Sequence, residues 1–175
     1  MSENPKKLYI YEALELQREY EERIKILSKL ISDLNHIIHE YRDDDTIRLV
    51  PISDMNQSEV KDKIRELEYK QRKLNNAIQY TNQNQTIEIN NETMTLAEAL
   101  HLKKSTGNKI KINQKELKSA SYGRIIYKEN RDIKELPGLS FNETEKRLEY
   151  NYLLFREINI KLRKISFEVT IDFTE

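Results

Sequence analysis

The residues best suited to bind a ligand lie in one short segment, YGRIIYKENRDIKELPGLSF, which begins at Tyr122. Aromatic and basic residues alternate there at Tyr122, Arg124, Tyr127, Lys128 and Arg131. Arg can form two parallel hydrogen bonds to a phosphate, and Tyr can stack on a base or hydrogen-bond through its hydroxyl. The pattern predicts a site for a small anionic, nucleotide-like ligand. The alternative is an arm that packs on a neighbouring subunit with its charges in solvent.

A second polar stretch, YTNQNQ, begins at Tyr80. Tyr80 and Asn82 could add hydrogen bonds to the same ligand if this stretch and the Tyr122 segment converge. We therefore include both residues among the predicted ligand-binding positions.

A weaker candidate is a divalent metal site. His36 and His39 lie three positions apart, and Asp43 follows one turn later. Two imidazoles and a carboxylate on one helix face can bind a metal ion. The alternative is a solvated polar face near a helix end, where His also suits the helix dipole.

Recognisable catalytic patterns are missing from the sequence. There is no Cys nucleophile and no G-x-S-x-G motif, and three scattered Gly form no phosphate-binding loop. Carboxylates are abundant, but their clusters fit helix surfaces and caps. We expect a protein that is not an enzyme and that needs no cofactor.

The composition points to long, partly exposed helices. Of 175 residues, 37% are hydrophobic and 34% charged, and the formal net charge is zero. Basic residues are interleaved with acidic ones, so we expect no nucleic-acid partner. No apolar run approaches the ~20 residues of a membrane span, and the N-terminus resembles no secretory signal. The expected location is cytoplasmic.

Apolar residues recur at steps of three and four in four segments, each typical of a helix packed along another helix. The first helix is expected from about Lys6 to Tyr41, and the second carries Val60 to Ile78 and ends at YTNQNQ. The third begins after Thr95, and the fourth reaches about Ile165. Capping boxes are predicted where Asn56, Thr95 and Asn142 precede Glu59, Glu98 and Glu145. The two connecting arms, each containing a Pro, are expected to be irregular.

Two short alternating stretches, TIEI from Thr86 and TIDF from Thr170, predict β-strands in a chain of helices. A second short strand could follow Asn90-Asn91. A lone strand is unstable, so we expect the two stretches to pair with each other or with another copy of the chain.

The two halves of the chain repeat the same order of parts. A shift of 86 aligns EAL at Glu12 with EAL at Glu98, and a shift of 84 aligns TIEI with TIDF. The repeat predicts two tandem antiparallel helical hairpins, 1–90 and 91–175, in one structural domain. The fold class is therefore mostly all-α and coiled-coil-like, with short β tags after the second and fourth helices.

At EALELQREYEERI, AIQYTN, TLAEALHLKK and YGRIIYK the chain resembles the septicolysin-like family of bacterial proteins. Tyr122, Arg124 and Lys128 match its arm motif, whereas Ile126 replaces an acidic residue and Gly123 a small hydroxyl residue. The resemblance implies an all-helical, oligomeric protein, and the family name implies a cytolysin.

The function expected from these observations is a non-enzymatic homo-oligomer. Thin helical hairpins bury little surface, so several copies are expected to complete the core and to hold a small anionic ligand at their boundaries. The alternatives are a membrane-acting toxin, as the family name suggests, and a structural or interaction protein with no ligand.

Overall fold

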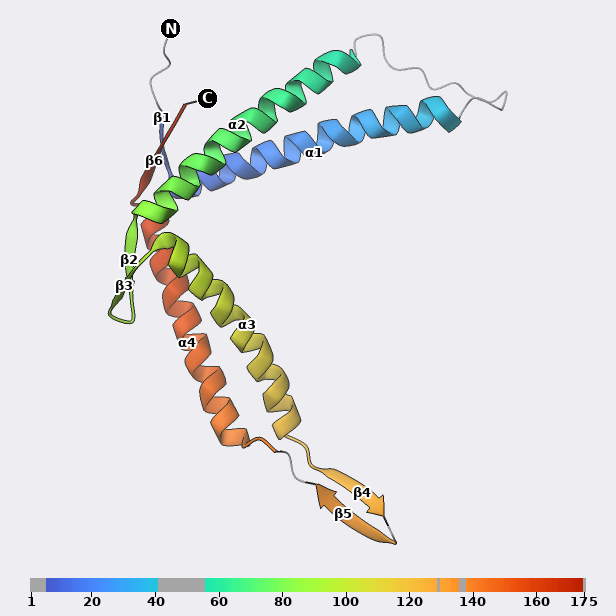
Figure 1. Ribbon diagram of the computed structural model, residues 1–175, viewed down its shortest axis with the longest axis vertical. Helices are drawn as coiled ribbons and strands as arrows, with labels where there is room; N and C mark the ends of the chain where they lie inside the picture. Colours follow the sequence, from blue (N-terminus) through green and yellow to red (C-terminus); the bar gives the residue numbers. More distant parts are fainter. Residues whose placement is uncertain (1–5, 41–55, 129, 136–137, 175) are drawn as a thin grey trace. The chain divides into compact units, whose positions relative to one another are not determined.

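The computed structural model describes residues 6–40, 56–128, 130–135 and 138–174 (Figure 1). This described part contains four α-helices and six short strands, so the mostly all-α class is confirmed. Contacts divide the chain into two compact units. The first unit is Met1–Thr81 with Ser166–Glu175, and the second unit is Asn82–Ile165. The C-terminal strand thus belongs with the N-terminal helices.

The first unit pairs two long helices, α1 (Ile10–Glu40) and α2 (Gln57–Asn84). The apolar residues that recur at steps of three and four form a buried stripe between the helices, which we call the seam. In this unit it includes Ala13, Tyr20, Leu67 and Leu74, so the predicted packing of helix on helix is confirmed. Burial fades along α1, where Ile24 is only half-buried. Gln71 Nε2 donates to Glu21 Oε1 at 3.4 Å and links the two helices. A helix pair of this kind buries one stripe of each helix and leaves the remaining faces polar.

Both ends of α2 follow from its sequence. The Asn56 side chain accepts a hydrogen bond from the Ser58 N–H at 3.0 Å and donates one to Glu59 at 3.2 Å, as predicted for a cap. α2 ends at Asn84, within the YTNQNQ stretch where its end was predicted. Thr81 is buried there, so packing outweighs the weak helix propensity of Thr and Asn.

The first residues of the chain's described part also differ from the prediction. Lys6–Tyr9 forms strand β1 rather than the first turn of a helix, and it pairs antiparallel with β6 (Thr170–Phe173). Leu8 lies opposite Ile171, and both side chains are buried. Burial of the alternate residues on one face of the pair stabilises a strand here.

The second unit begins with a hairpin of β2 (Thr86–Ile89) and β3 (Glu92–Thr95). Asn90 and Asn91 connect the strands with φ of 50° and 63°. Asn tolerates this left-handed conformation better than most residues, which suits a two-residue hairpin turn. Thr95 then caps α3 (Leu96–Ala120), and the predicted capping box with Glu98 is confirmed.

The second connecting arm contains regular strands, whereas an irregular arm was predicted. It forms a second hairpin, β4 (Arg124–Lys128) and β5 (Arg131–Glu135), between α3 and α4 (Phe141–Ser166). The cap of α4 was also mispredicted. Ser140 rather than Asn142 accepts from the backbone, with its Oγ 3.5 Å from the Glu143 N–H and its carbonyl 3.1 Å from the Thr144 N–H.

The two strand stretches, TIEI and TIDF, do not pair with each other as predicted. β2 pairs with β3, and β6 pairs with β1. The shift of 86 that relates the helices also places β1 on β3, and the shift of 84 places β2 on β6. The registers correspond as well, since Tyr9 opposite Thr170 becomes Thr95 opposite Thr86. The repeated unit is therefore strand, helix, arm, helix, strand, and each strand pair joins one copy to the other.

The helix pair of the second unit has a more polar seam than that of the first. Thr106, Asn113, Thr144 and Asn151 are all buried. Thr144 Oγ1 donates to the Ser140 carbonyl at 2.8 Å, and Asn151 Nδ2 donates to the Arg147 carbonyl at 2.9 Å. The Thr106 hydroxyl is buried without a hydrogen-bond partner. Leaving a buried hydroxyl unpaired costs free energy.

Replacing Thr106 with Val should therefore stabilise the protein. The substitution keeps the shape of the side chain and removes the unpaired hydroxyl, so the free energy of unfolding should rise by about 1 kcal/mol. Urea denaturation of the full chain, followed by circular dichroism, measures the change.

The matched control is Thr144→Val, which removes a hydroxyl that is hydrogen-bonded. It should lower the free energy of unfolding by about 1 kcal/mol. Equal effects of the two substitutions would contradict the difference in hydrogen bonding at the two sites.

A second prediction concerns the cap of α3. The Glu98 carboxylate accepts from the Thr95 N–H at 2.7 Å and from the Thr95 hydroxyl at 2.9 Å, and these bonds, chiefly the backbone one, lower the pKa of Glu98. Thr95→Ala should cost about 1 kcal/mol of unfolding free energy at pH 7, whereas Thr93→Ala on the exposed side of β3 should cost little.

The cost of Thr95→Ala should also depend on pH. Because the pKa of Glu98 is lowered on folding, its stabilisation is complete above the ordinary Glu pKa of about 4.3 and is lost as pH falls through the lowered value. Thr95→Ala removes the hydroxyl bond but keeps the residue 95 N–H, which is the larger cause of the lowered pKa. The difference between wild type and Thr95→Ala should therefore shrink below about pH 4 only by the contribution of the hydroxyl bond. Denaturation curves at pH 7 and pH 3 that give the same difference would exclude this contribution.

Candidate functional site

The predicted ligand-binding segment forms the hairpin of β4 and β5, which divides its residues between two faces. Arg124, Ile126 and Lys128 occupy positions of one face, opposite Glu135, Ile133 and Arg131. Ile125 and Tyr127 belong to the other face, opposite Lys134 and Asp132. The three predicted basic positions thus share one face, and Tyr127 lies on the reverse side.

Apolar side chains of this hairpin are open to solvent. Ile125 is 72% exposed, Tyr127 70% and Ile126 45%. A two-stranded ribbon without a buried face is marginally stable in water. The hairpin is therefore a surface that another molecule would stabilise.

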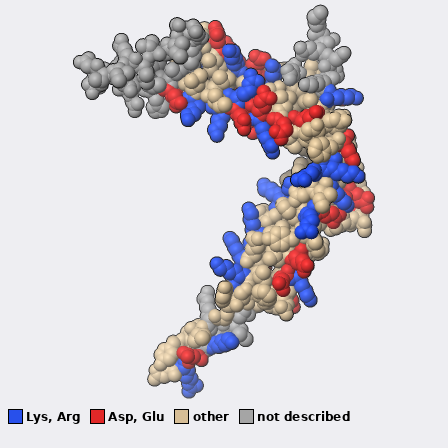
Figure 2. All heavy atoms as spheres, turned by 180° about the vertical axis from the view of Figure 1, so that it is seen from behind, with Lys and Arg blue, Asp and Glu red and all other residues tan. Residues whose placement is uncertain are grey.

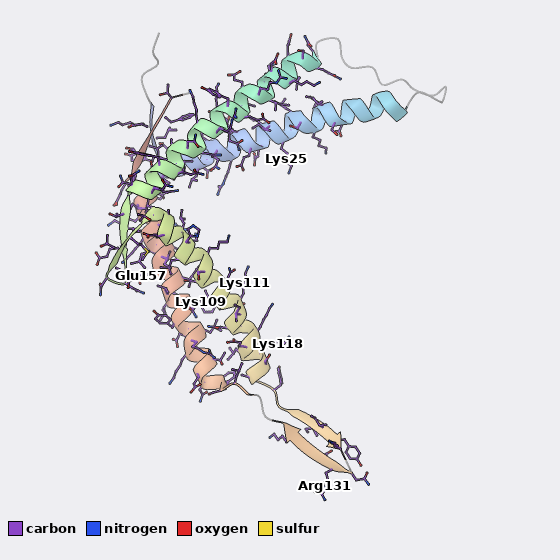
Figure 3. All side chains as sticks on the ribbon, viewed as in Figure 1. Lys25, Lys109, Lys111, Lys118, Arg131 and Glu157 are labelled. Atoms are coloured by element: carbon purple, nitrogen blue, oxygen red, sulfur yellow. The ribbon has the colours of Figure 1, made fainter. Side chains whose placement is uncertain are left out.

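The end of the hairpin brings two positive charges together. Lys128 and Arg131 are partners in the strand register, and both side chains are exposed. Figure 3 labels Arg131 at the end of the hairpin. Asn130 lies in the turn with φ of 60°, and its Oδ1 accepts from the Tyr127 hydroxyl at 2.9 Å. Like charges directly across a strand pair are destabilising. An anion bound between Lys128 and Arg131 would relieve this repulsion.

The structure does not bring the other predicted residues to this position within one chain. Asn82 is half-buried in α2, close to the start of α3, where Leu96 N–H donates to the Gln85 carbonyl. The hairpin of β4 and β5 follows the other end of α3, about 37 Å away along 25 residues. Tyr80 is 70% exposed and belongs to the first unit. Tyr122 precedes β4 and is equally exposed.

The weak metal candidates cannot be placed. Asp43 and the side chains of His36 and His39 lie outside the described residues. Among the residues that the structure describes, no three His, Asp or Glu side chains are grouped as a metal site would require.

The second unit carries a positive charge that the whole-chain composition conceals. Residues 82–165 contain 16 Lys and Arg and 11 Asp and Glu, a formal net charge of +5, and the remaining residues carry −5. Helix α3 contributes strongly, because Lys104, Lys111, Lys115 and Lys118 recur on one exposed face. Figure 2 shows basic side chains along one side of this unit, and Figure 3 shows Lys111 and Lys118 on α3. Such a field raises the local concentration of anions around the unit.

Glu157 makes polar contacts with Asn90 and Lys161, and the contact with Asn90 was not predicted from the sequence. Its carboxylate accepts from Lys161 at 2.9 Å and from the Asn90 N–H at 3.4 Å, and these bonds, the Lys161 bond first, lower its pKa. Asn90 lies in the turn between β2 and β3, so Glu157 fastens that turn to α4. The sequence indicates only the ion pair with Lys161, four residues later, and contains no signal for the contact with Asn90.

Comparisons with known proteins show the fold and leave the activity open. No family model matches the chain, and no curated protein matches it. It is similar to a solved structure described as a functionally unknown conserved protein from Corynebacterium diphtheriae, with a TM-score of 0.72 and 18% identity over 95% of this chain and 100% of that one. In the part of the chain that the structure describes, no helix has the length and apolar character of a membrane span.

Proposed function

We propose that this protein is a non-enzymatic binding protein that assembles from several copies and holds a small anionic ligand, with a phosphate group, at the tip of the β4–β5 hairpin. The observation that carries the proposal is the like-charged pair Lys128 and Arg131, exposed and directly opposite each other in the strand register.

The chemistry of the pair favours a phosphate. The Arg131 guanidinium can present two parallel N–H donors to phosphate oxygens, and the Lys128 ammonium adds a compact charge. The second unit around them has a formal net charge of +5, which favours the approach of an anion. Tyr127 belongs to the reverse face of the hairpin and Tyr122 precedes β4, so the proposal depends on the phosphate contacts of Lys128 and Arg131.

Titration calorimetry with inorganic pyrophosphate and ATP, at micromolar protein, tests the proposal. Both should bind, because phosphate is the part that the two charges recognise. Lys128→Gln should weaken binding about tenfold, since it removes one of two direct charge contacts.

The control is Lys146→Gln on the exposed surface of α4, which removes one charge from the same unit and should leave the affinity almost unchanged. Equal weakening by both substitutions would show that binding depends on the net charge of the unit and not on a specific site at Lys128. Absence of binding by either probe would reject the ligand and favour the alternative of a structural or interaction protein.

A further inference from the structure

The outer edge of β5 is an unpaired strand edge. In the described part of the chain, β5 pairs with β4 alone. Residues 129 and 130 connect the two strands, so Lys128 and Arg131 flank a two-residue loop. Residues that flank such a loop exchange backbone hydrogen bonds, and bonded pairs then alternate with non-bonded pairs. The backbone N–H and C=O groups of Asp132 and Lys134 consequently point away from β4.

The sequence of β5 is complementary to itself when it is read in the opposite direction. It runs Arg131, Asp132, Ile133, Lys134, Glu135. If two copies align antiparallel with Ile133 opposite Ile133, then Arg131 faces Glu135 and Asp132 faces Lys134. Every charged residue of the strand therefore meets an opposite charge in the second copy.

We propose that β5 pairs antiparallel with β5 of a second copy of this chain, about a twofold axis at Ile133. The outward groups of Asp132 and Lys134 would then form roughly four backbone hydrogen bonds between the copies. The product is a four-stranded sheet in the order β4, β5, β5, β4. Ile126 and Ile133 of both copies occupy one row of register positions in this sheet.

Other pairings of the same hairpin place like charges together. Antiparallel pairing of β4 with itself about Ile126 sets Arg124 opposite Lys128, both basic. A slip of the β5 pairing by two residues sets Asp132 opposite Asp132 or Lys134 opposite Lys134. Like charges directly opposite in a sheet are unfavourable, so the charge pattern selects the register centred on Ile133.

An exposed strand edge is usually blunted by charged side chains, by being very short, by Pro or by a bulge. β5 is short and is charged at all positions except Ile133, and these features oppose most partners, but its charges alternate in sign and therefore match a second antiparallel copy. Together with the exposed Ile125, Ile126 and Tyr127, this edge suits a second copy of the same chain.

A charge-swap series in ligand-free protein tests the pairing. Light scattering after size exclusion should give a dimer for the wild type. Lys134→Asp places two acidic residues opposite each other twice in the interface, and should weaken dimerisation about tenfold or more. The double substitution Lys134→Asp with Asp132→Lys restores opposite charges and should restore the dimer. Within the hairpin, Lys134 and Asp132 face Ile125 and Tyr127, so neither substitution breaks an internal charge pair.

The matched control is Lys146→Asp, an equal charge reversal on α4 that should leave the dimer intact. A wild-type monomer at all concentrations, or equal weakening by the single and double variants, would overturn the pairing. A dimer without phosphate binding would retain the pairing and reject the proposed function, so the two failures are distinguishable.

A covalent test uses the fact that the chain has no cysteine. Residues directly opposite in a non-bonded antiparallel pair have Cα atoms about 4.5 Å apart, within the range of a disulfide. Ile133→Cys should therefore form a disulfide-linked dimer under mild oxidation, whereas Ile112→Cys on exposed α3 should not. A folded Ile133→Cys protein that stays uncrosslinked would contradict the twofold axis.

Discussion

A pair of antiparallel helices can bury only one stripe of each helix, and the rest of this chain is arranged around that limit. In the first unit the buried stripe includes Ala13, Tyr20 and Leu74, and in the second it includes Ala99 and Ile158. No third layer covers these helices among the described residues of either unit. Because these cores are thin, the stability of the fold also depends on the residues that pack against the ends of each helix pair.

Short antiparallel strands supply that cover at one end of each pair. Leu8, Ile171 and Phe173 are buried in the sheet of β1 and β6, and Ile87 and Ile89 in the sheet of β2 and β3. The two sheets have corresponding registers under the shifts of 86 and 84 residues. One is closed by the Asn90-Asn91 turn, and the other is made from strands near the two ends of the chain. This exchange of strands ties the two copies of the repeat together.

The helices could be predicted from the sequence because their periodicity is carried by many residues. The Thr95 cap and the Asn56 cap were predictable for the same reason, since each depends on two residues three apart. Strand β1 was not, because Lys6–Tyr9 is extended only through its pairing with β6, more than 160 residues later. Boundaries that depend on distant packing, such as the start of α1 at Ile10, cannot be read from local sequence rules.

The candidate site was predictable in residue type but not in arrangement. The alternation of Tyr and basic residues from Tyr122 to Arg131 was visible, whereas the hairpin that separates Tyr127 from Lys128 was not. The Pro after β5 suggested an irregular arm, and the hairpin turn carries none of the Gly that usually marks one. Tyr80 and Asn82 were predicted to join the site because their stretch is polar. In the structure the 25-residue helix α3 separates Asn82 from the β4–β5 hairpin.

The proposed pairing of β5 with a second copy is tested most directly by residue-resolved amide hydrogen exchange of the intact protein. The account predicts that the Asp132 and Lys134 amides are protected in concentrated wild-type protein and lose that protection in Lys134→Asp or on dilution below the dimer dissociation constant. Exchange of these two amides at the rate of an open strand edge, at every concentration, would contradict it.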